Sequence, residues 1–277
     1  MCEFCHQHGE GKIWYLQAKN YADELANDLR RKRSVGEFLH NFEKEQRKNL
    51  DRMRQLPRAP KWVQSLIRRF VTQHQKKVHF GQVVPIEDVE AILSMMNHVV
   101  RVPCLCRRVI HSKEVRCCYG ISISPNGHSF RELVDPSYWN GPDGPGAEVL
   151  DKSAALEAMH GYERQGLMHS VWTFGTPFIA GICNCSPQDC LAAMSTDTYG
   201  LQVMFRAEYV AVVDPLKCNG CRACQRRCPF ELIGDSERKA VIDPTRCYGC
   251  GVCRTACKAD AISLLPRNAV PEAAGVW

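Results

Sequence analysis

The chain contains 277 residues and has a formal net charge of +6; 45% of its residues are hydrophobic and 24% are charged. These proportions are ordinary for a soluble globular protein, and the length is sufficient for two or three domains. No apolar run reaches the roughly eighteen residues of a membrane-spanning helix, and the first residues, MCEFCH, lack the basic and apolar regions of a secretory signal. We therefore expect a cytoplasmic protein without a membrane span.

Residues 1–100 are expected to form a basic and mostly helical segment. Between Lys12 and about Gln55, apolar residues recur at helical spacing, which indicates two helices with a break near residues 34–36. Residues 1–80 contain seventeen Lys and Arg but only nine Asp and Glu, so the positive charge of the chain is concentrated here.

Two further helices are expected in this segment. One begins after Pro60 and carries an apolar stripe that contains Trp62 and Phe70. In the other, the acidic pair Glu87 and Asp88 falls in the first turn, where negative charge suits the positive end of the helix dipole.

Residues 101–208 form the second expected unit, a cysteine-rich α+β domain. An amphipathic helix is predicted from Asp151 to about Gln165, because Gly166 can adopt the left-handed conformation that ends a helix. Short runs typical of strands lie at residues 119–124, 170–174 and 178–182, and a loop rich in Gly and Pro covers residues 140–148. The predicted fold class of the whole chain is α+β.

The last expected unit, residues 209–277, contains an internal duplication. The stretch VDPLKCNGCRACQRRCPFELI aligns without gaps with IDPTRCYGCGVCRTACKADAI, so that Cys218 corresponds to Cys247. Each copy has the form C-x2-C-x2-C-x3-C. Two copies of one unit imply pseudo-twofold symmetry.

This cysteine spacing is typical of iron–sulfur ligation. Three thiolates from one tight loop reach three corners of an iron–sulfur cube, and in a duplicated arrangement the fourth ligand comes from the other copy. The ligands predicted for the two [4Fe–4S] clusters are Cys218, Cys221, Cys224 and Cys257 for one, and Cys247, Cys250, Cys253 and Cys228 for the other.

Residues 209–265, about a fifth of the chain, resemble the bacterial-type ferredoxins that carry two [4Fe–4S] clusters. The resemblance implies a small pseudo-symmetric domain of two hairpins and two helices that transfers electrons. Lys258 stands where this family usually has a proline, a residue that shapes the turn but donates no ligand. A zinc ribbon or two zinc knuckles built from C-x2-C pairs are the alternative, although zinc sites commonly combine two cysteine pairs separated by a longer loop.

Seven further cysteines are predicted to supply a metal site in the middle domain: Cys104, Cys106, Cys117, Cys118, Cys183, Cys185 and Cys190. Persistent disulfides are rare in a reducing compartment, and separated thiols can converge on a metal if the fold brings their loops together. We favour a third iron–sulfur cluster ligated by a subset of them. A single zinc ion and a set of buried free thiols are the alternatives.

The words CLCR, CC, GLMH and ICNC in the middle domain resemble the N-terminal part of some large anaerobic ferredoxin-like proteins. His169 in GLMH, and Cys2, Cys5 and their neighbouring histidines in CEFCHQH, also have side chains that bind metals. A lone histidine before a strand is more often a structural group, and a chain end can be mobile. Neither is included in the predicted ligand set.

The basic run RRKR at residues 30–33 raises the possibility of nucleic-acid binding. Glu37 and Glu43 interrupt the basic stretch, and no DNA-binding motif accompanies it, so a solvated helix face or a docking surface for an acidic redox partner is favoured. The chain contains no P-loop, G-x-G-x-x-G or G-x-S-x-G motif, and catalysis has no visible site.

The sequence therefore favours a non-catalytic iron–sulfur electron-transfer subunit of anaerobic metabolism, which exchanges electrons with a flavoprotein or metalloenzyme in a hetero-oligomeric complex. A diffusing carrier needs only the last seventy residues or so, and we expect Trp14, Tyr15 and the helices after them to contribute to docking. The alternatives are a reductase with an additional cofactor beside a pocket in the middle domain, and an iron–sulfur redox sensor that contacts nucleic acid.

Overall fold

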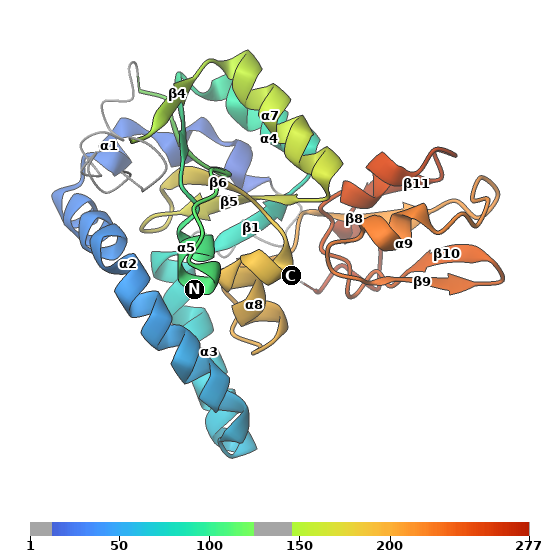
Figure 1. The fold of residues 1–277 in the computed structure, drawn as a ribbon, viewed down its shortest axis with the longest axis horizontal. Helices are drawn as coiled ribbons and strands as arrows, with labels where there is room; N and C mark the ends of the chain where they lie inside the picture. Colours follow the sequence, from blue (N-terminus) through green and yellow to red (C-terminus); the bar gives the residue numbers. More distant parts are fainter. Residues whose placement is uncertain (1–12, 125–145, 277) are drawn as a thin grey trace.

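The computed structural model describes residues 13–124 and 146–276 (Figure 1). It combines a helical N-terminal part, a central sheet and a ferredoxin-like domain that lies to one side of the sheet. The α+β fold class predicted from the sequence is confirmed. None of the described helices has the length and apolar character needed to cross a bilayer.

The N-terminal part consists of short turns followed by two long helices. Its elements are the 3-10 turns η1 (Trp14–Leu16) and η2 (Ala18–Tyr21), α1 (Asp23–Ala26), α2 (Leu29–Gln55), the 3-10 turn η3 (Leu56–Arg58) and α3 (Lys61–Val78). After η3 the chain reverses, so that α2 and α3 project together from the body of the protein (Figure 1).

The predicted helix break at residues 34–36 is wrong, because α2 continues through Gly36. Val35 and Leu39 on this helix are buried in one cluster with the sheet residue Val100. Burying an aliphatic side chain contributes about 1.5–3 kcal/mol, whereas a glycine within a helix costs about 1 kcal/mol. Packing against the sheet therefore outweighs the local preference for a break.

Two apolar groups of the N-terminal part differ in their exposure to solvent. Trp14 and Tyr15 are 0% exposed, and the Tyr15 hydroxyl donates to Asp88 at 2.6 Å, so the expectation that they contribute to a docking surface is wrong. In α3, which begins after Pro60 as predicted, no residue is buried. Its stripe of Trp62, Leu66 and Phe70 is 68%, 59% and 73% exposed.

Seven strands of the described chain form the central sheet. In spatial order they are β4 (Glu148–Leu150), β2 (His98–Val102), β3 (Cys118–Ser122), β6 (Ile179–Cys185), β5 (Met168–Thr173), β1 (Gly81–Val84) and β7 (Met204–Phe205). All neighbours are antiparallel except β1 and β7, which are parallel. The domain boundary expected after residue 100 falls inside β2. Strand β1 also lies before that boundary, so the expected helical segment contributes strands to the same sheet.

The two faces of the sheet carry different layers. Helices α4 (Ile86–Met95) and α7 (Lys152–Gln165) cover one face together with η1, and α2, α5 (Leu105–His111) and α8 (Leu191–Asp197) lie over the other. Alternation along the strands decides the assignment, since Val171 packs with the first layer and Trp172 with the second. The predicted ends of α7 are confirmed by the Asp151 cap and by Gly166, whose φ is 91°.

The ferredoxin-like domain consists of two copies of one structural unit. The first unit contains β8 (Tyr209–Val213), α9 (Ala223–Arg227) and β9 (Ile233–Ser236), and the second contains β10 (Lys239–Ile242), the 3-10 turn η7 (Val252–Ala256) and β11 (Ile262–Pro266). Strand β8 pairs with β11, and β9 pairs with β10, in antiparallel fashion. Two 3-10 turns, η6 (Pro187–Asp189) and η8 (Arg267–Ala269), complete the described elements.

Candidate iron–sulfur and metal sites

The two cysteine arrays share one backbone conformation, as the duplication predicts. Gly220 and Gly249, two residues after the first cysteine of each array, have φ values of 73° and 71°. A Cβ at Gly220 would lie 2.1 Å from the Arg238 carbonyl oxygen, and one at Gly249 would lie 2.0 Å from the Tyr209 carbonyl oxygen. Only glycine fits both the conformation and the close approach.

This close approach directs backbone N–H groups at the first sulfur of each array. The N–H groups of Gly249 and Ala211 donate to Cys247 Sγ at 3.3 and 3.5 Å. At the equivalent position, hydrogen bonds from the N–H groups of Ala240 and Gly220 lower the pKa of Cys218. Donors of this kind favour a thiolate and stabilise an electron-rich cluster, so the donor set fits iron–sulfur ligation.

Each array has the last cysteine of the other copy beside it. Four thiol residues line one small cavity of about 20 Å³: Cys218, Cys221, Cys224 and Cys257. In the second array, burial and the neighbouring thiols of Cys253, Cys247 and Cys228 raise the pKa of Cys250. The structure thus brings together the two predicted sets of four.

The two arrays differ in their exposure to solvent. Cys221 of the first array is exposed, whereas Cys250 and Cys253 of the second array are buried. Tyr248 covers the second array on the inner side, with its ring stacked on Phe230 at a centroid distance of 3.9 Å. The first array therefore faces solvent, and the second faces the central sheet.

A buried arginine fixes the second array to the body of the protein. Arg267 is fully buried and donates to the carbonyl oxygens of Ala207, Tyr209 and Cys247, each at 2.8 Å. Burial lowers the pKa of Arg267 to about 10, so the guanidinium stays charged at neutral pH. At the surface, Arg254 and Glu87 form an ion pair at 2.7 Å between η7 and α4.

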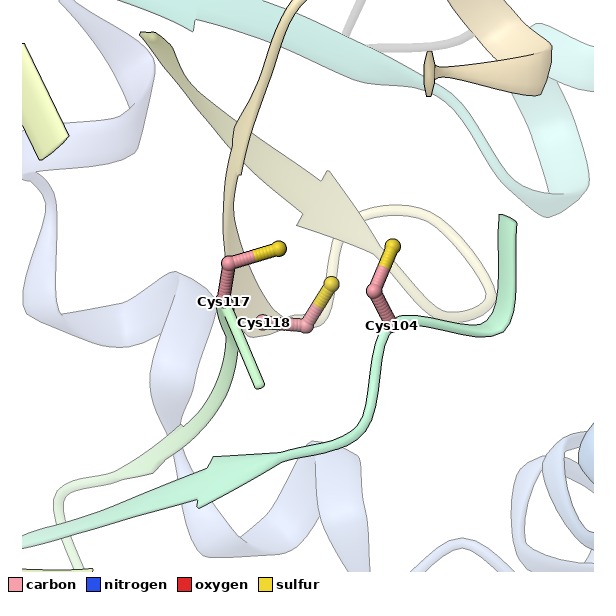
Figure 2. A group of neighbouring side chains, drawn as sticks. All are labelled: Cys104, Cys117 and Cys118. Atoms are coloured by element: carbon pink, nitrogen blue, oxygen red, sulfur yellow. The ribbon is translucent and has the colours of Figure 1, made fainter. Parts of the chain in front are cut away.

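All seven cysteines of the middle domain converge at one place. Cys104 and Cys106 lie at the start of α5, Cys117 and Cys118 at the start of β3, Cys183 and Cys185 at the end of β6, and Cys190 before α8. The sulfurs of Cys104, Cys117 and Cys118 lie within 4.8 Å of one another and point into a common space (Figure 2). Hydrogen bonds between thiols connect these three to the other four.

The seven thiols are not equivalent. Hydrogen bonds from neighbouring thiols lower the pKa of Cys104 and Cys190. The same bonds raise the pKa of their donors Cys106, Cys118 and Cys185. A dense group of sulfur donors, two of which are held toward the thiolate form, is the environment that soft transition metals prefer. We call this group the seven-cysteine site.

Arg107 adds a positive charge to the seven-cysteine site. Its guanidinium contacts Cys117 Sγ and donates to Asp189 at 2.9 Å. Burial opposes the charge, but the nearby thiols of Cys117 and Cys185, together with Asp189, raise the pKa of Arg107. Neither Arg107 nor Asp189 is among the side chains predicted for this site; the only indication in the sequence is that Arg107 closes the word CLCR and directly follows a predicted ligand.

The seven-cysteine site and the second array belong to the same hydrophobic core. Cys104, Cys117, Cys185 and Cys190 share a buried cluster with Cys250. The side chains that complete this cluster between the two groups of cysteines include Met168, Ala193, Met204, Ala207 and Tyr248. No layer of solvent-exposed residues separates the two groups within the described chain.

His169 does not join the thiols. Its Nδ1 lies 2.6 Å from Asn184 Oδ1, and the two residues are partners in the β5–β6 register. Cys183 and Cys185 flank Asn184 and therefore point to the opposite face of the sheet. Cys2, Cys5 and the histidines beside them lie outside the described residues, as do residues 140–145 of the predicted loop.

A family model of a 4Fe–4S dicluster domain matches residues 211–259. The match contains both cysteine arrays, and the zinc-ribbon alternative is therefore not favoured for this segment. No curated protein matches the chain. Together with the large number of cysteines, the matched domain indicates an iron–sulfur electron-transfer protein with a ferredoxin-like C-terminal domain.

Proposed function

We propose that this protein transfers electrons through three iron–sulfur centres in series. The outer [4Fe–4S] cluster is ligated by Cys218, Cys221, Cys224 and Cys257, and the inner one by Cys247, Cys250, Cys253 and Cys228. The third centre is ligated by a subset of the seven-cysteine site. When bound, such clusters accept and donate single electrons without breaking a bond in a substrate.

The observation that carries this proposal is the shared core between the inner array and the seven-cysteine site. The outer array contains the exposed Cys221, whereas each of the other two groups contains fully or nearly fully buried thiols, such as Cys250 and Cys104. A buried and continuous packing of side chains excludes water and holds the centres at fixed separations, which is what the protein contributes to electron transfer.

The surface around Cys221 is the proposed docking site for an external redox partner. Leu216, which precedes Cys218 and Cys221 in the same array, is 94% exposed, and Lys217 and Arg226 are exposed as well. An exposed apolar side chain among basic ones suits an acidic partner surface, because complementary charge steers association. We expect this partner to be a flavoprotein or metalloenzyme in a hetero-oligomeric complex.

A reductase is the second candidate function. The observation that favours it is a cavity of about 650 Å³ that six of the seven middle-domain cysteines line. A cavity of this size beside a redox centre can hold a small-molecule substrate or cofactor.

The series is tested by electron paramagnetic resonance of anaerobically purified protein during a stepwise reductive titration. We expect three sets of signals, and we expect the signal of the inner cluster to be broadened by the magnetic moment of the third centre. Cys104→Ala should remove the third set and sharpen the inner one, and Cys190→Ala serves as a second variant if the first does not fold. An unchanged spectrum in both folded variants would contradict the series.

A further inference from the structure

The cavity beside the seven-cysteine site has the dimensions of a ligand site. It measures about 650 Å³, within the range of roughly 300–1,000 Å³ that is usual for small-molecule pockets. One wall is α2, with Phe38, Phe42 and Met53, and the facing wall is α3, with Ile67 and Val71. The floor is the sheet face that carries the cysteines.

The interior of the cavity is apolar and aromatic. The rings of Phe38 and Phe42 meet edge to face at 5.3 Å, and His79 lies 4.7 Å from Phe38 and 5.0 Å from Trp172. Burial lowers the pKa of His79 to about 4, so its ring is neutral at physiological pH and its Nδ1–H donates to Thr173. The interior therefore suits an apolar body without a charge.

Polar side chains of α2 line part of the cavity. Gln46, Asn49 and Arg52 follow one another at helical spacing on this helix and are among the lining residues. Arg52 is exposed and donates to Asn49 Oδ1 at 3.3 Å. Among the lining residues of the described chain, Arg52 alone bears a full positive charge at neutral pH, so the part of the cavity that Arg52 lines favours an anion.

We propose that this cavity binds an amphipathic small molecule with an apolar body and a carboxylate or similar anionic group. The apolar body lies between α2 and α3, and the anion pairs with Arg52. The opposite end of the ligand then contacts the floor of the cavity, where Cys104, Cys106 and Cys185 are among the lining residues. The significance of this contact for electron transfer rests on the proposed third centre, whereas binding itself does not.

The test is isothermal titration calorimetry of the anaerobically purified full chain with octanoate and with 1-octanol. We expect one site per chain, and we expect octanoate to bind more tightly than the alcohol. Arg52→Gln should reduce octanoate affinity about tenfold and leave 1-octanol unchanged, since a hydrogen-bonded ion pair is removed. The control Arg54→Gln alters an exposed residue that pairs with Asp51 and does not line the cavity.

A second pair of variants distinguishes the cavity from the exposed surface of α3. Val71→Trp fills the cavity from a helix with no buried residue, and it should abolish binding of both probes. Val78→Trp introduces the same side chain on the same helix but outside the cavity lining, and binding should be retained. Binding that survives Val71→Trp but is lost in Trp62→Ala would overturn the proposal, because the probe would then sit on the exposed stripe.

The result of the binding experiments does not depend on whether the proposed function is correct. Iron content is measured on the same samples, so a protein that lacks a third centre but binds octanoate refutes only the third centre. A protein with a third centre and no octanoate binding refutes only the ligand site.

Discussion

Replacing Gly249 by alanine is expected to disrupt the inner cluster site. The new Cβ would lie 2.0 Å from the Tyr209 carbonyl oxygen, and ordinary contact begins at 3.4 Å, so the two backbone segments have to separate. The left-handed conformation alone costs an alanine about 1–2 kcal/mol. Separation also strains the Arg267 hydrogen bond to the Tyr209 carbonyl, and a hydrogen bond from a charged group contributes about 1.5–3 kcal/mol. We expect a total loss on the order of 3–5 kcal/mol.

The assay is the iron and acid-labile sulfide content of the variant, together with its thermal unfolding. Gly249→Ala should lose about four irons per chain, because the N–H donors of Gly249 and Ala211 move away from Cys247. The matched control is Gly234→Ala in the same domain, where the nearest atom to a new Cβ is 3.9 Å away and φ is not in the left-handed region. Full iron content and an unchanged melting temperature in Gly249→Ala would refute this reasoning.

Two further predictions concern the contact between the ferredoxin-like domain and the rest of the protein, and the buried His169. Tyr248→Ala should lower the free energy of unfolding by about 3–5 kcal/mol, because a buried, stacked ring is removed. Arg254→Gln should lower it by less than about 1 kcal/mol, because the ion pair of Arg254 with Glu87 is partly exposed. Comparing the melting temperatures of the two variants checks this contrast. Burial lowers the pKa of His169 to about 4. Between pH 6.5 and about 4 the unfolded chain therefore binds a proton that the folded chain does not bind. The free energy of unfolding should decrease as the pH is lowered through that window, by up to roughly 3 kcal/mol. The fall in melting temperature from pH 7.5 to 5.5 should be smaller in His169→Gln, and an equal fall in both proteins would argue against a neutral His169.

The ferredoxin-like domain could be predicted because its determinants are local. Each cysteine array lies within one short stretch of chain, residues 218–228 and 247–257, and the gapless alignment of the two copies is enough to make Gly220 and Gly249 equivalent. The left-handed residues at equivalent places, Glu231 and Asp260, follow the same repeat. The spacing of residues that are close in the sequence therefore indicates both the type of ligand and the backbone conformation of this domain.

The seven-cysteine site could be predicted only as a set of residue types. Its convergence depends on the β3–β6 register, in which Cys118 faces Cys183, and on the placement of α5 and α8 around it. Such pairing joins segments that are far apart in the sequence, and no local pattern specifies it. The contribution of Arg107 depends on the same tertiary arrangement.

The helical errors have a related cause. Gly36 suggested a break, but burial of Val35 and Leu39 keeps α2 continuous. The sequence of α3 has an apolar face, and this pattern is the same whether the face packs on a core or is exposed to solvent. Periodicity alone therefore could not indicate that Trp62 and Phe70 are exposed.

The central claim is that the seven-cysteine site holds an iron–sulfur centre beside the inner cluster. Its most direct test is the count of iron and acid-labile sulfide per chain in protein purified without oxygen. The account predicts about twelve of each, since three cubane centres contain four irons and four sulfides apiece. A count of about eight, with the seven middle-domain thiols free to react with an alkylating reagent, would contradict it.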